Sequence, residues 1–199
     1  MIANMLVLDY MKSKRDFLFK ILLPFIIIFA AFQSGYGNMV LVMVLIFTIL
    51  TGAGLKIAKL KNNNIYDRLL ISPLDNKLFF LEFTATYTGL YILQFIPIFI
   101  VASFYNSFLI VPFLILAIAM IVIIGILIGI HATSFGEVHL YSIFTVIPLI
   151  GVAMMDNPIS YMFPFLYITL PMFSIQGIFL CLIITIFLYI ILIIDVSRI

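Results

Sequence analysis

The sequence is poor in charge, in cysteine and in tryptophan. Lys, Arg, Asp and Glu make up 9% of its 199 residues, tryptophan is absent, and Cys181 is the single cysteine. Soluble domains carry about 25% charged residues, so this composition excludes an ordinary soluble domain. One cysteine excludes an internal disulfide framework and a clustered cysteine metal site, and we expect Cys181 to be a small buried apolar residue.

Apolar residues dominate what remains. They make up 66% of the chain, and the mean hydropathy is +1.36. A spanning helix needs about 20 mostly apolar residues, so the length allows about six spans and leaves roughly 80 residues for connections. This leaves no room for a soluble catalytic domain, which usually takes about 100 residues or more.

The apolar runs predict an all-α polytopic membrane protein, in which residues 1–199 form a single transmembrane domain. Residues 1–17 mix apolar and charged positions, which predicts a short interfacial helix. No small-residue cleavage pattern follows the first apolar run, so we expect it to be retained rather than removed as a signal peptide. The six predicted spans are, within about two residues, 19–33, 39–57, 78–103, 108–130, 140–155 and 172–194.

The lysines and arginines lie before, between or after the apolar runs. If the six predicted spans cross the membrane in turn, all of these residues fall on one side of it. In membrane proteins the cytoplasmic loops carry an excess of Lys and Arg. We therefore expect a multi-pass protein of the cell membrane whose two termini both lie in the cytoplasm. A net charge of +2, confined to the membrane edges, favours contact with the lipid bilayer and argues against a nucleic-acid partner. The ten basic residues are Lys12, Lys14, Arg15, Lys20, Lys56, Lys59, Lys61, Arg68, Lys77 and Arg198.

The polar stretch between the second and third spans carries the most informative local pattern. A run of three asparagines can cap a helix, and Ser72-Pro73 stops it because the residue before proline disfavours helical angles. We therefore expect a short helix over residues 65–71, with Ile65 and Leu69 on one face. Such a helix is suited to insertion into a partner's groove. The alternative is an ordinary interfacial loop.

Two stretches resemble the permease subunits of ATP-binding-cassette exporters of the type-2 class. Residues 66–74, Tyr-Asp-Arg-Leu-Leu-Ile-Ser-Pro-Leu, are similar to that family's pattern of an acidic residue, an arginine, two or three aliphatics, Ser/Thr-Pro and Leu. Asn157-Pro158 through Pro164 is similar to its re-entrant element. The resemblance covers the whole chain in layout and these two stretches in local sequence. The chain lacks the large extracellular domain that some members insert after the first span.

The resemblance implies six spans with an N-terminal interfacial helix, a cytoplasmic coupling helix in residues 62–74 and an extracellular re-entrant segment in residues 156–171. It implies a dimer, of identical or related permeases, that exports a hydrophobic or amphipathic molecule such as a peptide, lipid or drug-like compound. ATP and Mg²⁺ would be bound by a separate cytoplasmic ATPase subunit. The residues expected to contact that subunit are Ile65, Tyr66, Asp67, Arg68, Leu69 and Leu70.

The chain itself has no G-x-x-x-x-G-K-[ST] phosphate loop, so we expect neither a cofactor nor enzymatic activity in it. An intramembrane enzyme would need a nucleophile, an acid–base pair or a metal cluster at membrane depth, and the predicted spans carry none. An accessory or structural multi-pass membrane protein without transport activity is the alternative function.

The proline-rich segment predicts irregular backbone at membrane depth. Proline frees backbone carbonyls that lipid cannot satisfy, so Asn157, Pro158 and Pro164 are expected where protein covers the chain or where it lines a cavity. The alternative is an aromatic belt with no gating role.

Polar and small residues within the spans are further candidates. We expect the substrate path at the dimer interface between the first, second and fifth spans, where Thr48, Ser142 and Thr145 can line it. Gly125 and Gly129 form a small-xxx-small pattern, which predicts close approach of two helices.

Three titratable residues surround the connection between the fourth and fifth spans. His131, Glu137 and His139 match no zincin spacing, so a solvated turn is expected there instead of a metal site. Glu82, near the start of the third span, is expected to be solvated or paired with a nearby basic residue.

Overall fold

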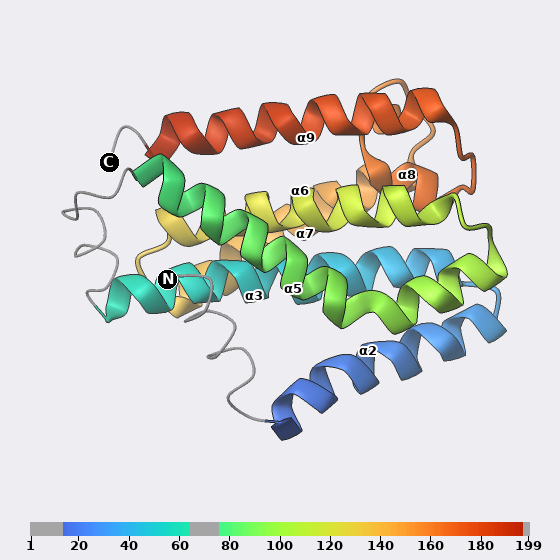
Figure 1. The fold of residues 1–199 in the computed structure, drawn as a ribbon, viewed down its shortest axis with the longest axis horizontal. Helices are drawn as coiled ribbons and strands as arrows, with labels where there is room; N and C mark the ends of the chain where they lie inside the picture. Colours follow the sequence, from blue (N-terminus) through green and yellow to red (C-terminus); the bar gives the residue numbers. More distant parts are fainter. Residues whose placement is uncertain (1–13, 64–75, 197–199) are drawn as a thin grey trace.

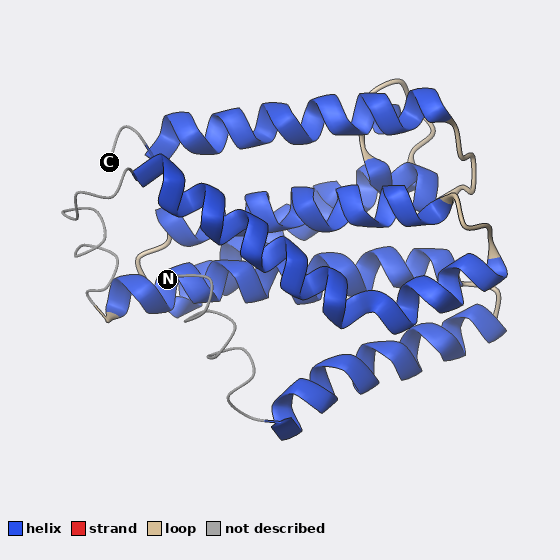
Figure 2. Ribbon diagram, in the orientation of Figure 1, coloured by secondary structure: helices blue, strands red, loops and turns tan. Residues whose placement is uncertain are grey.

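The computed structural model describes residues 14–63 and 76–196 of the chain. In these residues the protein is all α-helical and contains no β-strand (Figure 2), which confirms the predicted fold class. The elements in chain order are α2 (Lys14–Gln33), α3 (Gly37–Asn62), α5 (Asn76–Tyr105), α6 (Ile110–His131), α7 (Phe135–Met154), the 3-10 turn η1 (Ser160–Met162), α8 (Pro164–Thr169) and α9 (Ile175–Val196).

Five helices in the described ranges are long and apolar enough to cross a membrane: α3, α5, α6, α7 and α9. This supports a multi-pass membrane protein, because a hydrocarbon core of about 30 Å needs about 20 residues of helix. The first predicted span falls on α2. Its apolar part, Ile21–Gln33, is shorter than the five helices named above. The sixth crossing and the sidedness of the chain stay predictions.

Consecutive long helices run in opposite directions, so that their ends gather at two opposite ends of the bundle (Figure 1). At one end α3, α6 and α9 stop and α5 and α7 start; we name it the basic end, because Lys59 and Lys61 lie in the last turn of α3. The opposite end, the distal end, holds the connections 34–36, 106–109 and 155–174. No lysine or arginine occurs in these three connections.

Helix α6 lies at the centre of the bundle and α9 at its outside. Of the α6 span 67% is buried, against 17% of the α9 span, so α9 presents most of its surface outward. The α6 sequence has no Asp, Glu, Lys or Arg, which fits a helix that is largely buried in the bundle. Large aromatic side chains fill the space around it, among them Phe80, Phe83, Phe95 and Phe113, each fully buried.

Two glycines of α6 let it pack closely on α3. A Cβ added to Gly125 would lie 2.8 Å from the carbonyl oxygen of Leu50, and one added to Gly129 would lie 2.6 Å from that of Gly54. Real Cβ atoms do not approach so closely, so a side chain at either position would force the helices apart. This confirms the close packing predicted from the small-xxx-small pattern.

A left-handed glycine ends α2 and turns the chain into α3. Gly35 has a φ of 85°, which glycine adopts without steric cost. The amide of Tyr36 donates to the carbonyl of Ala31 at 3.0 Å, and the amide of Gly35 donates to that of Phe32 at 3.3 Å. These two bonds make a Schellman motif, which satisfies carbonyls at the helix end.

Side chains at the distal end join the turns that follow α2 and α5. Gln33 Nε2 donates to the Tyr105 hydroxyl at 2.6 Å. Asn38 and Asn106 exchange two amide hydrogen bonds, at 2.9 and 3.0 Å. The sequence predicts a short uncharged turn at each place, and the structure shows that the two turns bind each other.

Two predicted elements lie wholly or largely outside the described residues. The structure describes only residues 62 and 63 of the predicted coupling region, so all six expected ATPase contacts, residues 65–70, fall outside it. Of the predicted interfacial helix only residues 14–17 are described, as the start of α2.

Candidate functional site

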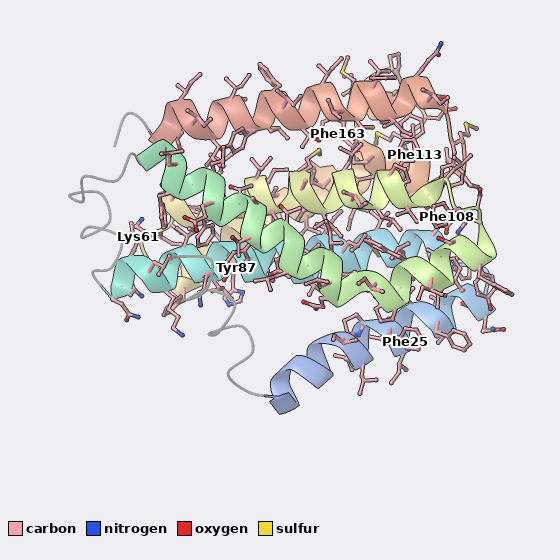
Figure 3. The ribbon with its side chains drawn as sticks, viewed as in Figure 1. Phe25, Lys61, Tyr87, Phe108, Phe113 and Phe163 are labelled. Carbon is pink, nitrogen blue, oxygen red and sulfur yellow. The ribbon has the colours of Figure 1, made fainter. Side chains whose placement is uncertain are left out.

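At the basic end, Lys61 fastens the end of α3 to the end of α6 (Figure 3). Its Nζ donates to the carbonyl oxygen of Ile130 at 2.7 Å and to that of Ala132 at 2.8 Å. These carbonyls lie at the C-terminus of a helix, where the peptide dipoles favour a cation. The chain therefore enters the predicted coupling region from a fixed point. Sequence analysis assigned Lys61 to topology alone and missed this contact.

The connection between α6 and α7 is a capped helix start. The Ser134 hydroxyl accepts from the amide of Glu137 at 3.2 Å, and Glu137 Oε2 accepts from the amide of Thr133 at 2.7 Å. The pair closely resembles a capping box, in which Ser and Glu three residues apart satisfy free amides. It explains why α7 begins at Phe135, ahead of the predicted span, and it gives Glu137 a structural role.

A hydrogen bond between side chains joins the end of α6 to the end of α9. His131 Nε2 lies 2.8 Å from Asp195 Oδ2, with the two side chains 62% and 27% exposed. The sequence places His131 after the fourth predicted span and Asp195 after the sixth, and only the fold brings them together. His139 is exposed on α7, and Glu82 is half-buried on α5. Within the described ranges, no three His, Cys, Asp or Glu side chains are grouped to hold a metal ion.

At the distal end, the proline-rich segment folds into η1 and the short helix α8. Asn157 Oδ1 accepts from the amide of Ser160 at 3.0 Å and starts η1, while Pro164 starts α8, where its missing N–H costs nothing. Pro158 is exposed. Thr169 Oγ1 donates to the Ala153 carbonyl at 2.5 Å, which joins α8 to α7. The buried residues of α8 are Pro164, Phe165, Leu166, Tyr167 and Ile168.

Within this segment the regular helix α8 is the part that protein covers, whereas Pro158, Pro171 and Met172 in the irregular backbone around it are exposed. Helix α8 packs against α6, α7 and α3, and Figure 1 shows it at the end of the bundle beneath the start of α9. The re-entrant and extracellular character of the segment stays a prediction.

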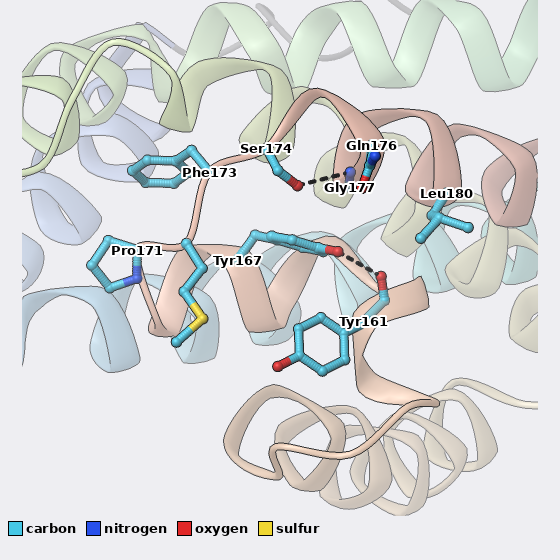
Figure 4. Close-up of a pocket in the computed structure, with 9 residues that line it drawn as sticks. Tyr161, Tyr167, Pro171, Phe173, Ser174, Gln176, Gly177 and Leu180 are labelled. Atoms are coloured by element: carbon cyan, nitrogen blue, oxygen red, sulfur yellow. Dashed lines mark hydrogen bonds between the residues drawn. The ribbon is translucent and has the colours of Figure 1, made fainter.

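A pocket of about 590 Å³ opens between this segment and the start of α9 (Figure 4). The Tyr167 hydroxyl donates to the Tyr161 carbonyl at 3.0 Å, and Ser174 Oγ accepts from the amide of Gly177 at 3.0 Å, which caps α9. A Cβ at Gly177 would lie 2.6 Å from the Tyr167 ring, so glycine lets the ring lie against α9. The lining residues are Tyr161, Tyr167, Pro171, Met172, Phe173, Ser174, Gln176, Gly177 and Leu180.

A carboxylate stands beside this pocket. The Tyr161 hydroxyl donates to Asp156 Oδ1 at 2.6 Å. This hydrogen bond and the negative charge of Asp156 raise the pKa of Tyr161 above its ordinary value, so the hydroxyl remains a donor at neutral pH. Sequence analysis had treated these aromatic residues as an interfacial belt or a gate and did not predict a pocket.

The three residues predicted to line a substrate path lie on two helices that pack against each other. Thr48 is half-buried on α3, while Ser142 and Thr145 lie on α7. Ser142 is 1% exposed, so it faces the interior of the bundle, and its hydroxyl has no hydrogen-bond partner among the described residues. Thr145 Oγ1 donates to the Tyr141 carbonyl of its own helix at 2.7 Å. Their role in a path stays a prediction.

The class of protein that these features define is a helical bundle with the dimensions and composition of a multi-pass membrane protein. No protein-family model matches the sequence, no curated protein matches it significantly, and no solved structure matches the fold significantly.

Proposed function

We propose that the chain is the transmembrane permease subunit of an ATP-driven exporter of the type-2 ATP-binding-cassette class. The observation that carries the proposal is the Asp67–Pro73 pattern, which lies in the sequence between two long apolar helices, α3 and α5. The end of α3 and the start of α5, which flank the pattern in the sequence, both lie at the basic end of the bundle (Figure 1).

The fastening of α3 to α6 supports this assignment. A coupling element must pass motion into the spans, and a loose connection would absorb it. Lys61 fixes the last turn of α3 to the carbonyl groups that end α6, and Gly54 and Gly129 bring the two helices close together. A displacement at the start of the coupling region would therefore move two helices of the core.

In this proposal the permease forms a dimer, and an amphipathic or hydrophobic substrate crosses between the two copies. The dimer face would combine α2, α3 and α7; α2 and α7 bear many exposed apolar side chains, and α3 adds Phe47. Thr48 and Thr145, both half-buried, are the polar groups suited to line the path, whereas Ser142 would act from behind it. Replacement of Thr145 by tryptophan should block transport, whereas Leu93→Trp, on the exposed face of α5, should not; equal transport by both variants would refute this placement.

The coupling assignment is tested by charge reversal. We expect Arg68→Glu and Leu69→Glu each to abolish co-purification of an ATPase that carries a phosphate loop, and to abolish ATP-dependent export from inverted vesicles. Lys59→Glu is the matched control, because Lys59 is exposed on the last turn of α3 and lies outside the pattern.

Two results would contradict the proposal. Unaltered ATPase binding and export in both variants would show that the segment does not couple. A wild-type chain that purifies from its native membrane without any such ATPase would favour the accessory membrane protein instead.

A further inference from the structure

The distal pocket is lined by aromatic rings from three consecutive parts of the chain. Tyr161 comes from η1, Tyr167 from α8, and Phe173 from the residues that lead into α9 (Figure 4). Met172 and Leu180 add apolar surface. A volume of about 590 Å³ falls within the range of about 300–1,000 Å³ that small-molecule sites occupy.

These rings are held in place without a ligand. Tyr167 is 5% exposed and stacks on Phe113, with ring centroids 4.6 Å apart. Tyr161 meets Tyr167 edge to face, with centroids 6.2 Å apart, and Phe173 meets Phe113 at 5.8 Å. A preformed wall loses little conformational entropy when a ligand binds, which favours affinity.

The charge beside the pocket is negative, and the connections at the distal end contain no lysine or arginine to match it. In the connections at the distal end, Asp156 is the sole Asp, Glu, Lys or Arg, and its Oδ1 accepts from the Tyr161 hydroxyl at 2.6 Å. Aromatic faces attract cations through their quadrupole, and a carboxylate nearby adds to that attraction. An anionic group would find no lysine or arginine in these connections.

We propose that this pocket binds an amphiphile with a cationic amine head, quaternary or protonated, and an apolar tail. The head lies among the rings of Tyr161, Tyr167 and Phe173 beside Asp156. The tail passes Leu180 and follows the outer face of α9, where exposed Ile183 and Phe187 continue the apolar surface at helical spacing. The same head chemistry belongs to a free amphiphilic amine and to a choline phospholipid.

The test is a binding assay on the purified full-length protein in dodecyl maltoside, a neutral detergent without choline. Binding of radiolabelled dodecyltrimethylammonium is measured by scintillation proximity. The competitors are dodecyldimethylamine N-oxide, which has the same tail and head size without net charge, and dodecylphosphocholine, which carries the phospholipid head. We expect the labelled cation to bind saturably. We expect the N-oxide to compete about tenfold or more weakly than unlabelled dodecyltrimethylammonium.

Variants separate the charge from the rings. Asp156→Asn should weaken binding by about 3- to 10-fold, and Phe173→Leu, which keeps an apolar side chain and removes the ring, by about 2- to 30-fold. Asp195→Asn makes the same change at the basic end and should leave binding within about twofold. Monodisperse elution of each variant verifies that it folds.

The outcomes are distinct. Absence of saturable binding, equal competition by the N-oxide, or unchanged binding by Asp156→Asn would each overturn the proposal. If the cationic probe binds as expected, dodecylphosphocholine is compared with unlabelled dodecyltrimethylammonium. Equal competition identifies the natural ligand as a choline phospholipid, and weaker competition identifies it as a free amphiphilic amine. The assay involves neither ATP nor transport, so its result does not depend on the proposed function.

Discussion

Replacement of Gly129 by alanine tests the close packing of α6 on α3. The new methyl group would lie 2.6 Å from the carbonyl oxygen of Gly54 and 2.7 Å from Cβ of Ile57, whereas ordinary contact begins at 3.4 Å. The helices must therefore separate by the difference between 2.6 and 3.4 Å, roughly 0.8 Å. Gaps of 0.5–1 Å forfeit about a quarter to a half of the dispersion energy of the neighbouring contacts, and overpacking costs about 1–3 kcal/mol.

A matched control isolates this cost from helix propensity. Alanine in place of a helical glycine gains up to about 1 kcal/mol, so Gly129→Ala combines a gain with a clash. Gly151, on α7, has no atom within 4 Å of its added Cβ, and Gly151→Ala has the gain alone. We expect Gly129→Ala to be less stable than Gly151→Ala by about 1–3 kcal/mol, or roughly 2–12 °C in unfolding temperature.

Cys181 provides the assay. It is the single cysteine of the chain and is 0% exposed, so a thiol-reactive fluorescent dye labels it only as the bundle opens on heating. Equal unfolding temperatures for Gly129→Ala and Gly151→Ala would refute the packing argument. Adding Gly125→Ala to Gly129→Ala should cost less than the sum of the single changes, because one separation of the helices relieves both clashes.

Two further predictions use the same dye assay. Lys61→Met keeps an apolar stem but removes both hydrogen bonds to α6, and should lower the free energy of unfolding by about 1.5–3 kcal/mol. The control is Lys59→Met, at an exposed position on the same turn, which should change the free energy of unfolding by less than about 0.5 kcal/mol. Similar losses in both variants would show that charge alone matters. Ser134→Ala removes the acceptor for the Glu137 amide and should cost about 1 kcal/mol, while Ser134→Asp retains a cap. Equal stability of the alanine and aspartate variants would contradict the capping role.

Hydrophobicity predicted the helices well because it is a property of consecutive residues. The fourth predicted span, 108–130, nearly coincides with α6, Ile110–His131. Boundaries were missed where polar side chains extend a helix beyond its apolar run. Helix α3 continues to Asn62, where Lys61 binds the end of α6, and α7 starts at Phe135 because Ser134 caps it. The Ser-x-x-Glu spacing of that cap was readable in the sequence.

Contacts between distant segments could not be read from the sequence. His131 and Asp195 are 64 residues apart, and no local pattern links them. The same holds for the pocket, whose wall depends on Tyr167 lying against Gly177 and on Phe113 of a different helix. The sequence contained one usable signal, the isolation of Asp156 among uncharged connections, but its neighbours became known only from the fold.

The fastening of α3 has a mechanical consequence. Helix α3 has 26 residues and is about 39 Å long at 1.5 Å per residue. At one end Lys61 joins it to α6, and at the other Asn38 joins it to Asn106 in the turn after α5. Helix α3 is therefore a rigid element that side-chain hydrogen bonds attach to its neighbours at both ends. A push along its axis at Asn63 would reach the distal turns with little lost to bending, whereas a sideways push would have to rotate α3 and α6 together.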